Sequence, residues 1–150
     1  MKKTFIIILI TILFVGCARH TKSIEVGFWN VENLFDLEDD PLKNDDEFSL
    51  GGKKMITQEI LNMKLDHMNE VISDLSVDIL GLCEVENRRV LEMLNNKYPE
   101  KNYSIVHYES PDSRGIDAAL LYDIEKFTVV ESYPIEITFG NEAPTRDILY

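Results

Sequence analysis

Asn30 and Glu84 are the two residues of this 150-residue chain whose positions most suggest chemistry. Asn30 follows a strand-forming run at 26–29, and Glu84 follows an apolar run at 79–83. A helical connection between parallel strands brings their carboxyl ends to one edge of a sheet, where open α/β sheets bind ligands. Mg²⁺ prefers carboxylate oxygens, with phosphate and water completing its shell. Polar residues end many strands, however. From spacing alone, the alternative to a shared site is that Asn30 and Glu84 simply end two strands and have no joint function.

The elements that must position these residues follow from hydrophobic periodicity. Residues 24–30 predict a strand, and an apolar stripe at steps of three and four predicts a helix over 57–75. Residues 77–85 predict a strand that is buried on both faces. The other predicted elements are a loop at 36–56, a helix at 88–97, a turn at 110–115, and strands at 103–108, 117–123, 127–139 (interrupted at Pro134) and 146–150. This order predicts an α/β or α+β domain with a mixed sheet flanked by helices.

The start of the chain predicts export. A short basic start precedes an apolar run at 5–15, which is too short for a membrane-spanning helix of roughly 20 residues and is typical of a secretory signal. The segment Phe14-Val15-Gly16-Cys17 resembles a bacterial lipobox, which implies a signal peptide at 1–16, a lipidated Cys17 and a tether at 17–23. The mature protein would then be anchored by lipid to the bacterial cell envelope, outside the cytoplasm. An ordinary signal with a chance cysteine is the alternative.

The chain is acidic, with a net charge of −12 that becomes −14 if Lys2 and Lys3 leave with the signal. This balance argues against a broad electrostatic grip on nucleic acid, because Lys and Arg must neutralise its phosphates. It does not exclude an enzyme that meets phosphate through a metal and a few local cations. With Cys17 lipidated, Cys83 has no partner in the chain, and its apolar surroundings predict an inert buried thiol.

Four segments resemble the opening of the endonuclease/exonuclease/phosphatase superfamily. They are FWNVENLFD at 28–36, DILGLCEVEN at 78–87, SRGIDAALLYD at 113–123 and TRDIL at 145–149. The resemblance implies a four-layer α/β sandwich with mixed sheets flanked by helices. It also implies that residues 24–150 are the N-terminal part, about half, of a metal-dependent phosphoester hydrolase domain.

The resemblance assigns roles to three residues. Glu84 would be the principal metal ligand, Asn30 would orient phosphate or metal-bound water and join the metal site, and Arg146 would lie near the scissile phosphate. The implied ion is Mg²⁺, with Mn²⁺ or Ca²⁺ as alternatives. The implied substrate is nucleic acid or a small phosphoester, and no protein partner is inferred. Where the family usually has Gln before the metal-binding Glu, this chain has Cys83.

The histidines do not match the motifs in which the family places its catalytic base. They are His20 in the tether, His67 in the predicted helix and His107 at a strand end. The base is therefore expected after residue 150, and the 150-residue chain alone is expected to be inactive. A non-catalytic, membrane-anchored binding module that keeps the fold is the alternative from a different functional class.

Two other polar segments leave their roles open. The acidic residues at 36–47 lack the alternating ligand spacing of a Ca²⁺ loop, which favours a solvated insertion. Arg114 and Asp117 flank a glycine turn, and they are either substrate contacts or a turn residue and a strand-start cap.

Replacing the predicted lipidation residue tests the export prediction. Cys17→Ser removes the thiol that would carry the diacylglycerol, so the chain should lose incorporation of labelled fatty acid and move out of the detergent phase. Stable anchoring needs more than one acyl chain, so the shift should be nearly complete. Unchanged labelling and partition would contradict the prediction.

Overall fold

The computed structural model describes residues 23–98, 102–140 and 144–150. The elements in chain order are β1 (Val26–Leu34), α1 (Gln58–Leu75), β2 (Ile79–Val85), α2 (Arg88–Asn96), β3 (Tyr103–His107), β4 (Asp117–Asp123), β5 (Pro134–Ile135) and β6 (Ile148–Leu149). The predicted signal peptide, the lipidation residue Cys17 and His20 lie outside these residues. Within the described ranges, no helix is both long and apolar enough to cross a membrane.

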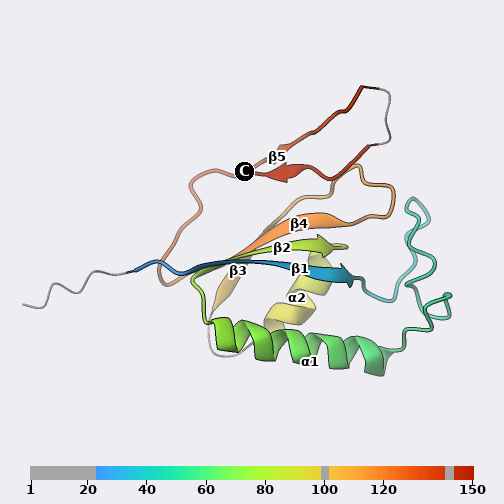
Figure 1. The fold of residues 1–150 in the computed structure, drawn as a ribbon, viewed down its shortest axis with the longest axis horizontal. Coiled ribbons are helices and arrows are strands. Elements are labelled where there is room, and N and C mark those ends of the chain that lie inside the picture. The colour runs from blue at the N-terminus through green and yellow to red at the C-terminus, as the bar shows by residue number, and fades with distance from the viewer. Residues whose placement is uncertain (1–22, 99–101, 141–143) are drawn as a thin grey trace, which may run out of the picture.

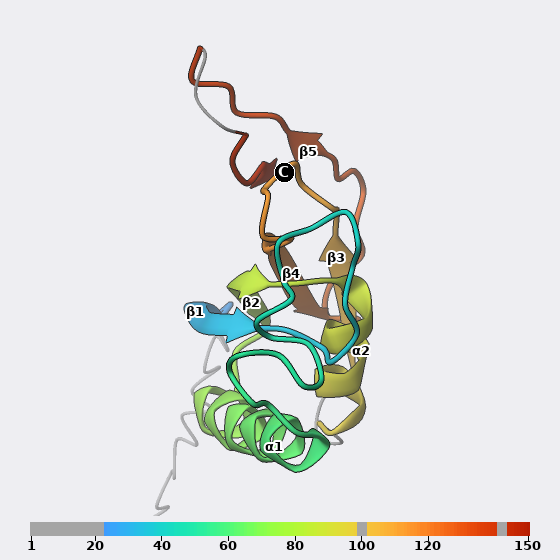
Figure 2. The same cartoon turned by 90° about the vertical axis from the view of Figure 1, so that its right-hand side faces the viewer.

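Four strands form one mixed sheet in the order β1-β2-β4-β3. β1 and β2 are parallel, and β4 is antiparallel to both β2 and β3. The ends of β1, β2 and β3 and the start of β4 therefore share one edge of the sheet. Both helices lie on the same side of this sheet (Figures 1 and 2). The mixed sheet with two helices confirms the predicted α+β class, and it forms one sheet layer and one helix layer of the implied sandwich.

The core fills the space between the sheet and the two helices. Leu80 and Leu82 of β2 are fully buried there. The predicted stripe of α1 is buried for four of its five members and exposed at Leu75, the last; the buried members are Leu61, Leu65, Met68 and Ile72. Thr57 caps α1 as predicted, because its side chain accepts a hydrogen bond from the N–H of Ile60. α1 is thus the helical connection between β1 and β2, and its apolar stripe packs it against the sheet so that the two strands can pair in parallel.

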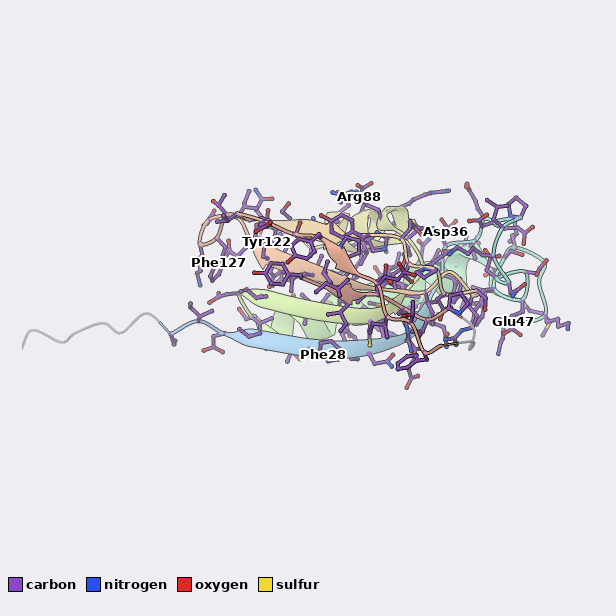
Figure 3. All side chains as sticks on the ribbon, turned by 90° about the horizontal axis from the view of Figure 1, so that it is seen from above. Phe28, Asp36, Glu47, Arg88, Tyr122 and Phe127 are labelled. Carbon is purple, nitrogen blue, oxygen red and sulfur yellow. The ribbon has the colours of Figure 1, made fainter. Side chains whose placement is uncertain are left out.

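The opposite face of the sheet is largely uncovered in the described residues. Val26 and Phe28 of β1 are 67% and 75% exposed. Gly27, between them, faces the helices, where a side chain would meet Leu80 and Val77. Figure 3 looks onto the sheet from the side away from the helices, with Phe28 along β1 and Glu47 in the loop beyond the end of that strand. The sheet therefore has one packed face and one face that is open along β1.

Three predicted strands differ from the observed ones. The strand predicted at 127–139 is reduced to Pro134–Ile135, and the one predicted at 146–150 is reduced to Ile148–Leu149. These two short strands pair with each other rather than joining the four-stranded sheet. A segment with strand propensity forms a strand only where a neighbouring strand can pair with its backbone. Each of these two segments finds such a partner for only two residues. β1, by contrast, continues past Asn30 and ends at Leu34.

The two faces of the sheet predict different costs for truncating a side chain. Leu80→Ala should lower the free energy of unfolding by about 2–5 kcal/mol, because it leaves a cavity in the packed core. The matched variant Phe28→Ala, on the open face, should change it by less than about 0.5 kcal/mol. Urea unfolding followed by circular dichroism measures both values. An equal cost for the two variants would mean that the Phe28 face is covered in solution.

Candidate functional site

Glu84 is the extra residue of a bulge near the end of β2. The register between β2 and β4 shifts between Cys83 and Val85, so Glu84 has no partner residue in β4. Its φ is 65°, a left-handed conformation that few residues other than glycine adopt. Bulges of this kind re-aim a side chain beside a site, and such a conformation persists only where the surroundings enforce it.

β1 is irregular at the same level of the sheet. Its register with β2 shifts between Asn30 and Leu34. Glu32 and Asn33, within this stretch, have φ values of 53° and 58°. This backbone turns the N–H of Asn33 toward β2, where it donates to Oε2 of Glu84 at 3.2 Å. The two irregular strand segments are thus joined through one carboxylate.

Asn30 and Arg146 reach the same carboxylate. Nδ2 of Asn30 donates to Oε1 of Glu84 at 3.1 Å, and Oδ1 of Asn30 accepts from the N–H of Glu32 at 2.9 Å. Nη1 of Arg146 lies 3.8 Å from Oε1 of Glu84. The side chain of Glu84 is 21% exposed and that of Arg146 is 36% exposed. The structure therefore brings together the three residues that the sequence analysis nominated for the site.

Lys64 supports this arrangement, and the sequence analysis missed it. Its Nζ, projecting from α1, donates to the carbonyl oxygens of Glu32 at 2.7 Å and Asn33 at 3.1 Å. Burial lowers the pKa of Lys64, and the nearby charges of Glu32 and Glu84 oppose that shift. Lys64 lies beside the apolar stripe in the sequence, and nothing local indicates that its ammonium reaches β1.

The carboxylate of Glu84 fits a hard divalent cation. Each of its oxygens accepts one hydrogen bond from β1, and a carboxylate oxygen has a further lone pair. Its partial exposure leaves room for water and phosphate oxygens to complete a coordination shell. Asn30 presents its Nδ2 to Glu84, so here its amide orients the carboxylate. Direct coordination of a metal by Asn30 stays a prediction.

Cys83 is a free, partly buried thiol next to Glu84 in the chain. Burial raises the pKa of this thiol, and the charge of Glu84 acts in the same direction. The residue that replaces the family's usual Gln therefore adds no negative charge beside the carboxylate. The thiol is only partly buried, so the burial expected from the sequence is confirmed in part, and its inertness stays a prediction.

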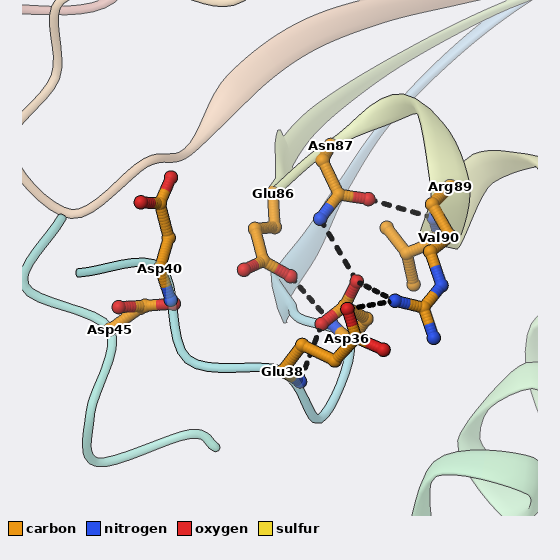
Figure 4. Close-up of polar contacts among 8 residues, drawn as sticks. All are labelled: Asp36, Glu38, Asp40, Asp45, Glu86, Asn87, Arg89 and Val90. Carbon is orange, nitrogen blue, oxygen red and sulfur yellow. Dashed lines mark hydrogen bonds and ion pairs between the residues drawn. The ribbon is translucent and has the colours of Figure 1, made fainter. Parts of the chain in front are cut away.

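A second group of carboxylates lies where the acidic loop meets the start of α2 (Figure 4). Asp36, Asp45 and Glu86 are 4%, 1% and 6% exposed. Oε2 of Glu86 accepts from the N–H of Asp36 at 2.6 Å, and Asn87 donates its Nδ2 to Asp36 at 3.1 Å. Arg89 pairs with Asp36 at 3.7 Å and also with Glu38. The expectation of a solvated loop at 36–47 is therefore wrong for two of its carboxylates, Asp36 and Asp45.

The acidic loop is buried in part because it packs back on the domain. The rings of Phe35 and Phe48 stack with their centroids 4.1 Å apart. Nζ of Lys43 donates to the carbonyl oxygens of Ser110 at 3.0 Å and Asp112 at 3.1 Å. These contacts close the loop over the turn that follows β3, which a reading of its charges alone could not indicate.

Glu86 has the most perturbed carboxyl group of this second cluster. The pKa of Glu86 is raised to about 8, chiefly by burial and also by the charges of Asp36 and Asp45, while the hydrogen bond from the N–H of Asp36 opposes the shift. Oδ1 of Asp45 is buried and has no hydrogen-bond partner among the described residues. A protonated Glu86 supplies this group of acids with a proton to share.

His107 and Asp117 form a buried pair. Nε2 of His107 lies 3.1 Å from Oδ2 of Asp117, and their side chains are 3% and 1% exposed. Asp117 is thus an interior hydrogen-bonding residue. Arg114, half exposed, pairs with Asp112 at 3.5 Å. His67 lies on α1 and lines an apolar groove away from these carboxylates.

Comparison with known proteins gives one match. The model of the endonuclease/exonuclease/phosphatase family matches residues 25–150. No curated protein and no solved structure matches the chain. The matched range includes both irregular strands and every residue that contacts Glu84.

The raised pKa of Glu86 predicts a stability that depends on pH. The folded state holds this proton more tightly than the unfolded state, so its contribution is complete below the ordinary pKa of 4.5 and is lost as pH rises toward about 8. Glu86→Gln imitates the protonated form. The variant should match the wild type near pH 5 and exceed its free energy of unfolding at pH 9 by more than about 1.4 kcal/mol, which is the worth of one pKa unit.

Denaturant titrations between pH 5 and 9 measure this difference. Glu70→Gln, which removes an exposed acid from α1, serves as the matched control and should follow the pH dependence of the wild type. A Glu86→Gln variant whose stability falls with pH as steeply as that of the wild type would contradict the assignment.

Proposed function

Since the chain belongs to the endonuclease/exonuclease/phosphatase family, we propose that Glu84 holds the divalent cation of a phosphoester hydrolase. The observation that carries the proposal is the convergence of Asn30 and Arg146 on this one carboxylate. Three left-handed residues, Glu32, Asn33 and Glu84, lie together at this point. Strained backbone of this kind clusters at functional sites, which supports a role beyond packing.

Each residue has a distinct task in this proposal. Mg²⁺, when bound, neutralises charge on the phosphoryl oxygens and activates water. Glu84 anchors the ion, and Asn30 fixes the rotation of the Glu84 carboxylate by donating Nδ2 to it. Arg146 binds the phosphate, because a guanidinium pairs with phosphate oxygens through two parallel hydrogen bonds. Lys64 keeps the carbonyls of β1 in place and acts as a positioning residue.

The charge of the chain favours a small phosphoester over a long nucleic acid as the substrate. At a net charge of −12 the surface repels a polyanion, and each additional phosphate contact would need its own Lys or Arg. Arg146 and the cation at Glu84 provide the positive charge that one phosphoester group needs. We further propose that the protein acts as an exported lipoprotein anchored through Cys17.

We assign no general base among the described histidines. His107 is engaged by Asp117, and its side chain is only 3% exposed. His67 lies on α1 beside an apolar groove lined by Trp29 and Met63. The proposal therefore assigns metal binding to Glu84 and phosphate binding to Arg146, and it names no residue as the base.

Hydrolysis by the full-length protein tests the proposal. Glu84→Gln keeps a hydrogen-bonding side chain but removes the negative charge, so Mg²⁺-dependent hydrolysis of a chromogenic phosphodiester should fall by more than about 100-fold. Mg²⁺ binding measured by calorimetry should fall with it. Because Gln keeps only one of the two acceptor oxygens, the melting temperature should also fall, while the circular dichroism spectrum at the assay temperature stays that of the folded wild type. Arg146→Lys should instead raise KM and leave Mg²⁺ binding intact.

Glu92→Gln is the matched control, because Glu92 is an exposed acid of α2 paired only with a surface arginine. It should leave both readouts unchanged. Hydrolysis that survives a chelator, or a Glu84→Gln enzyme with wild-type turnover, would overturn the proposal. A full-length wild type that binds phosphoesters without turnover would identify the non-catalytic binding module instead. Plasmid cleavage faster than phosphodiester hydrolysis would reverse the proposed substrate preference.

A further inference from the structure

Three side chains of metal-binding types gather where β3 ends and β4 begins. A ring nitrogen of His107 and carboxylate oxygens of Glu109 and Asp117 all lie within 4.8 Å of one another. We propose that these three residues, the β3–β4 cluster, bind a divalent transition-metal ion of the Zn²⁺ or Mn²⁺ class. This site is separate from the one proposed at Glu84.

The spacing of the two buried ligands fits a shared ion. Two ligand atoms about 2.1 Å from one ion, at an angle between a right angle and a tetrahedral one, lie about 3.0 to 3.4 Å apart. Nε2 of His107 and Oδ2 of Asp117 are 3.1 Å apart. An ion beside the line that joins these two atoms could therefore replace their shared proton after rotation of the two side chains, with the strands unchanged. His107 is paired in register with Ala119 of β4, so the sheet already holds this geometry.

The surroundings of Asp117 orient its carboxylate as a ligand. Oδ1 accepts a hydrogen bond from the N–H of Ser110 at 2.9 Å, which leaves Oδ2 facing His107. Outer hydrogen bonds of this kind fix the orientation of metal ligands. The side chain of Asp117 is 1% exposed, and a buried carboxylate is costly unless a positive charge or a donor compensates it. The N–H of Ser110 and the ring of His107 provide that compensation here, and a bound cation would take over the part of His107.

Glu109 gives an ion a route from solvent. It is exposed and lines a cleft of about 530 Å³ that also borders Lys43 and the acidic loop. The ammonium of Lys43 is held by the carbonyls of Ser110 and Asp112, so it has other partners at this point. Glu109 is thus the member of the β3–β4 cluster that borders the cleft, and water would complete the coordination from its side.

The donor set selects a class of ion. Mg²⁺ and Ca²⁺ take oxygen ligands almost entirely, whereas imidazole suits Zn²⁺ and other transition ions. One imidazole with two carboxylates therefore differs from the single carboxylate that we propose as the anchor of the ion at Glu84. The chain would hold two ions of different classes at one edge of the sheet.

Zn²⁺ titration of the full chain by calorimetry tests this proposal. The experiment uses the Glu84→Gln background as well as the wild type, so that a failure of the Glu84 site cannot be mistaken for a failure of this one. One Zn²⁺ should bind per chain in both backgrounds, and the ring ¹⁵N resonances of His107 should shift on binding. His107→Gln should abolish this binding, and Glu109→Gln should weaken it by at least 10-fold.

Because Glu109 is exposed, Glu109→Gln tests the site in a folded chain even where His107→Gln disrupts packing. Glu47→Gln, which removes an exposed acid of the neighbouring loop, is the control and should leave the Zn²⁺ affinity unchanged. A chain that binds no Zn²⁺ would overturn the proposal. The proposal would also be overturned if Glu109→Gln left the Zn²⁺ affinity unchanged and the ring resonances of His107 did not shift on addition of Zn²⁺. Either result would leave His107 and Asp117 as a buried proton-sharing pair.

Discussion

The hydrogen bonds that Glu84 accepts from β1 are the constraint on which this edge of the sheet depends. Asn30 and Asn33 both donate to the one carboxylate, and the N–H of Glu32 is satisfied by Asn30 in turn. Three residues in the left-handed region could not persist here without such partners. Lys64 closes the arrangement from α1 by engaging the carbonyls that the irregular β1 backbone turns toward it. The strain of this backbone is thus offset by two groups that each serve several partners, the Glu84 carboxylate as acceptor and the Lys64 ammonium as donor.

The bulge at Glu84 also distributes successive side chains to different environments. Glu84 is partly exposed and faces Arg146, whereas Val85 is fully buried in the core. Glu86 then lies among the acids of the loop, where burial raises its pKa to about 8. A regular strand would place Glu84 and Glu86 on the same face. The extra residue therefore separates two carboxyl groups, two residues apart in the chain, into environments with different chemistry.

Several cations of this acidic chain are engaged in holding it together. Lys43 ties the acidic loop to the turn after β3, and Lys64 ties α1 to β1. Lys126 pairs with the buried carboxylate of Asp78 at 2.5 Å. Arg89 pairs with the acids at the start of the loop. Lys43 and Lys64 bind backbone carbonyls, whereas Lys126 and Arg89 pair with carboxylates, so these four cations are engaged within the protein. This agrees with a substrate that brings only one phosphoester group to the site.

The sequence by itself determined the elements whose signal is local. The apolar period of α1 and its Thr57 cap, the buried run of β2 and the family motifs around Asn30 and Glu84 are each contained in one short segment. These signals predicted the mixed sheet and placed Asn30 and Glu84 at one edge, because parallel strands joined by a helix end on the same side. Arg146 was assigned to the same site through the family resemblance. They also predicted that Cys83 is a quiet thiol.

Only the tertiary structure decided the features that depend on distant partners. The strand predicted at 127–139 is reduced to two residues, because a strand needs a neighbour that periodicity cannot supply. Asp36 and Asp45 are buried, although they belong to a run of acids, because the loop packs against residues far along the chain. The pairing of His107 with Asp117 arises from the register of β3 and β4. Burial and charge at these positions are set by what folds over them, and that information is not local to any stretch of the chain.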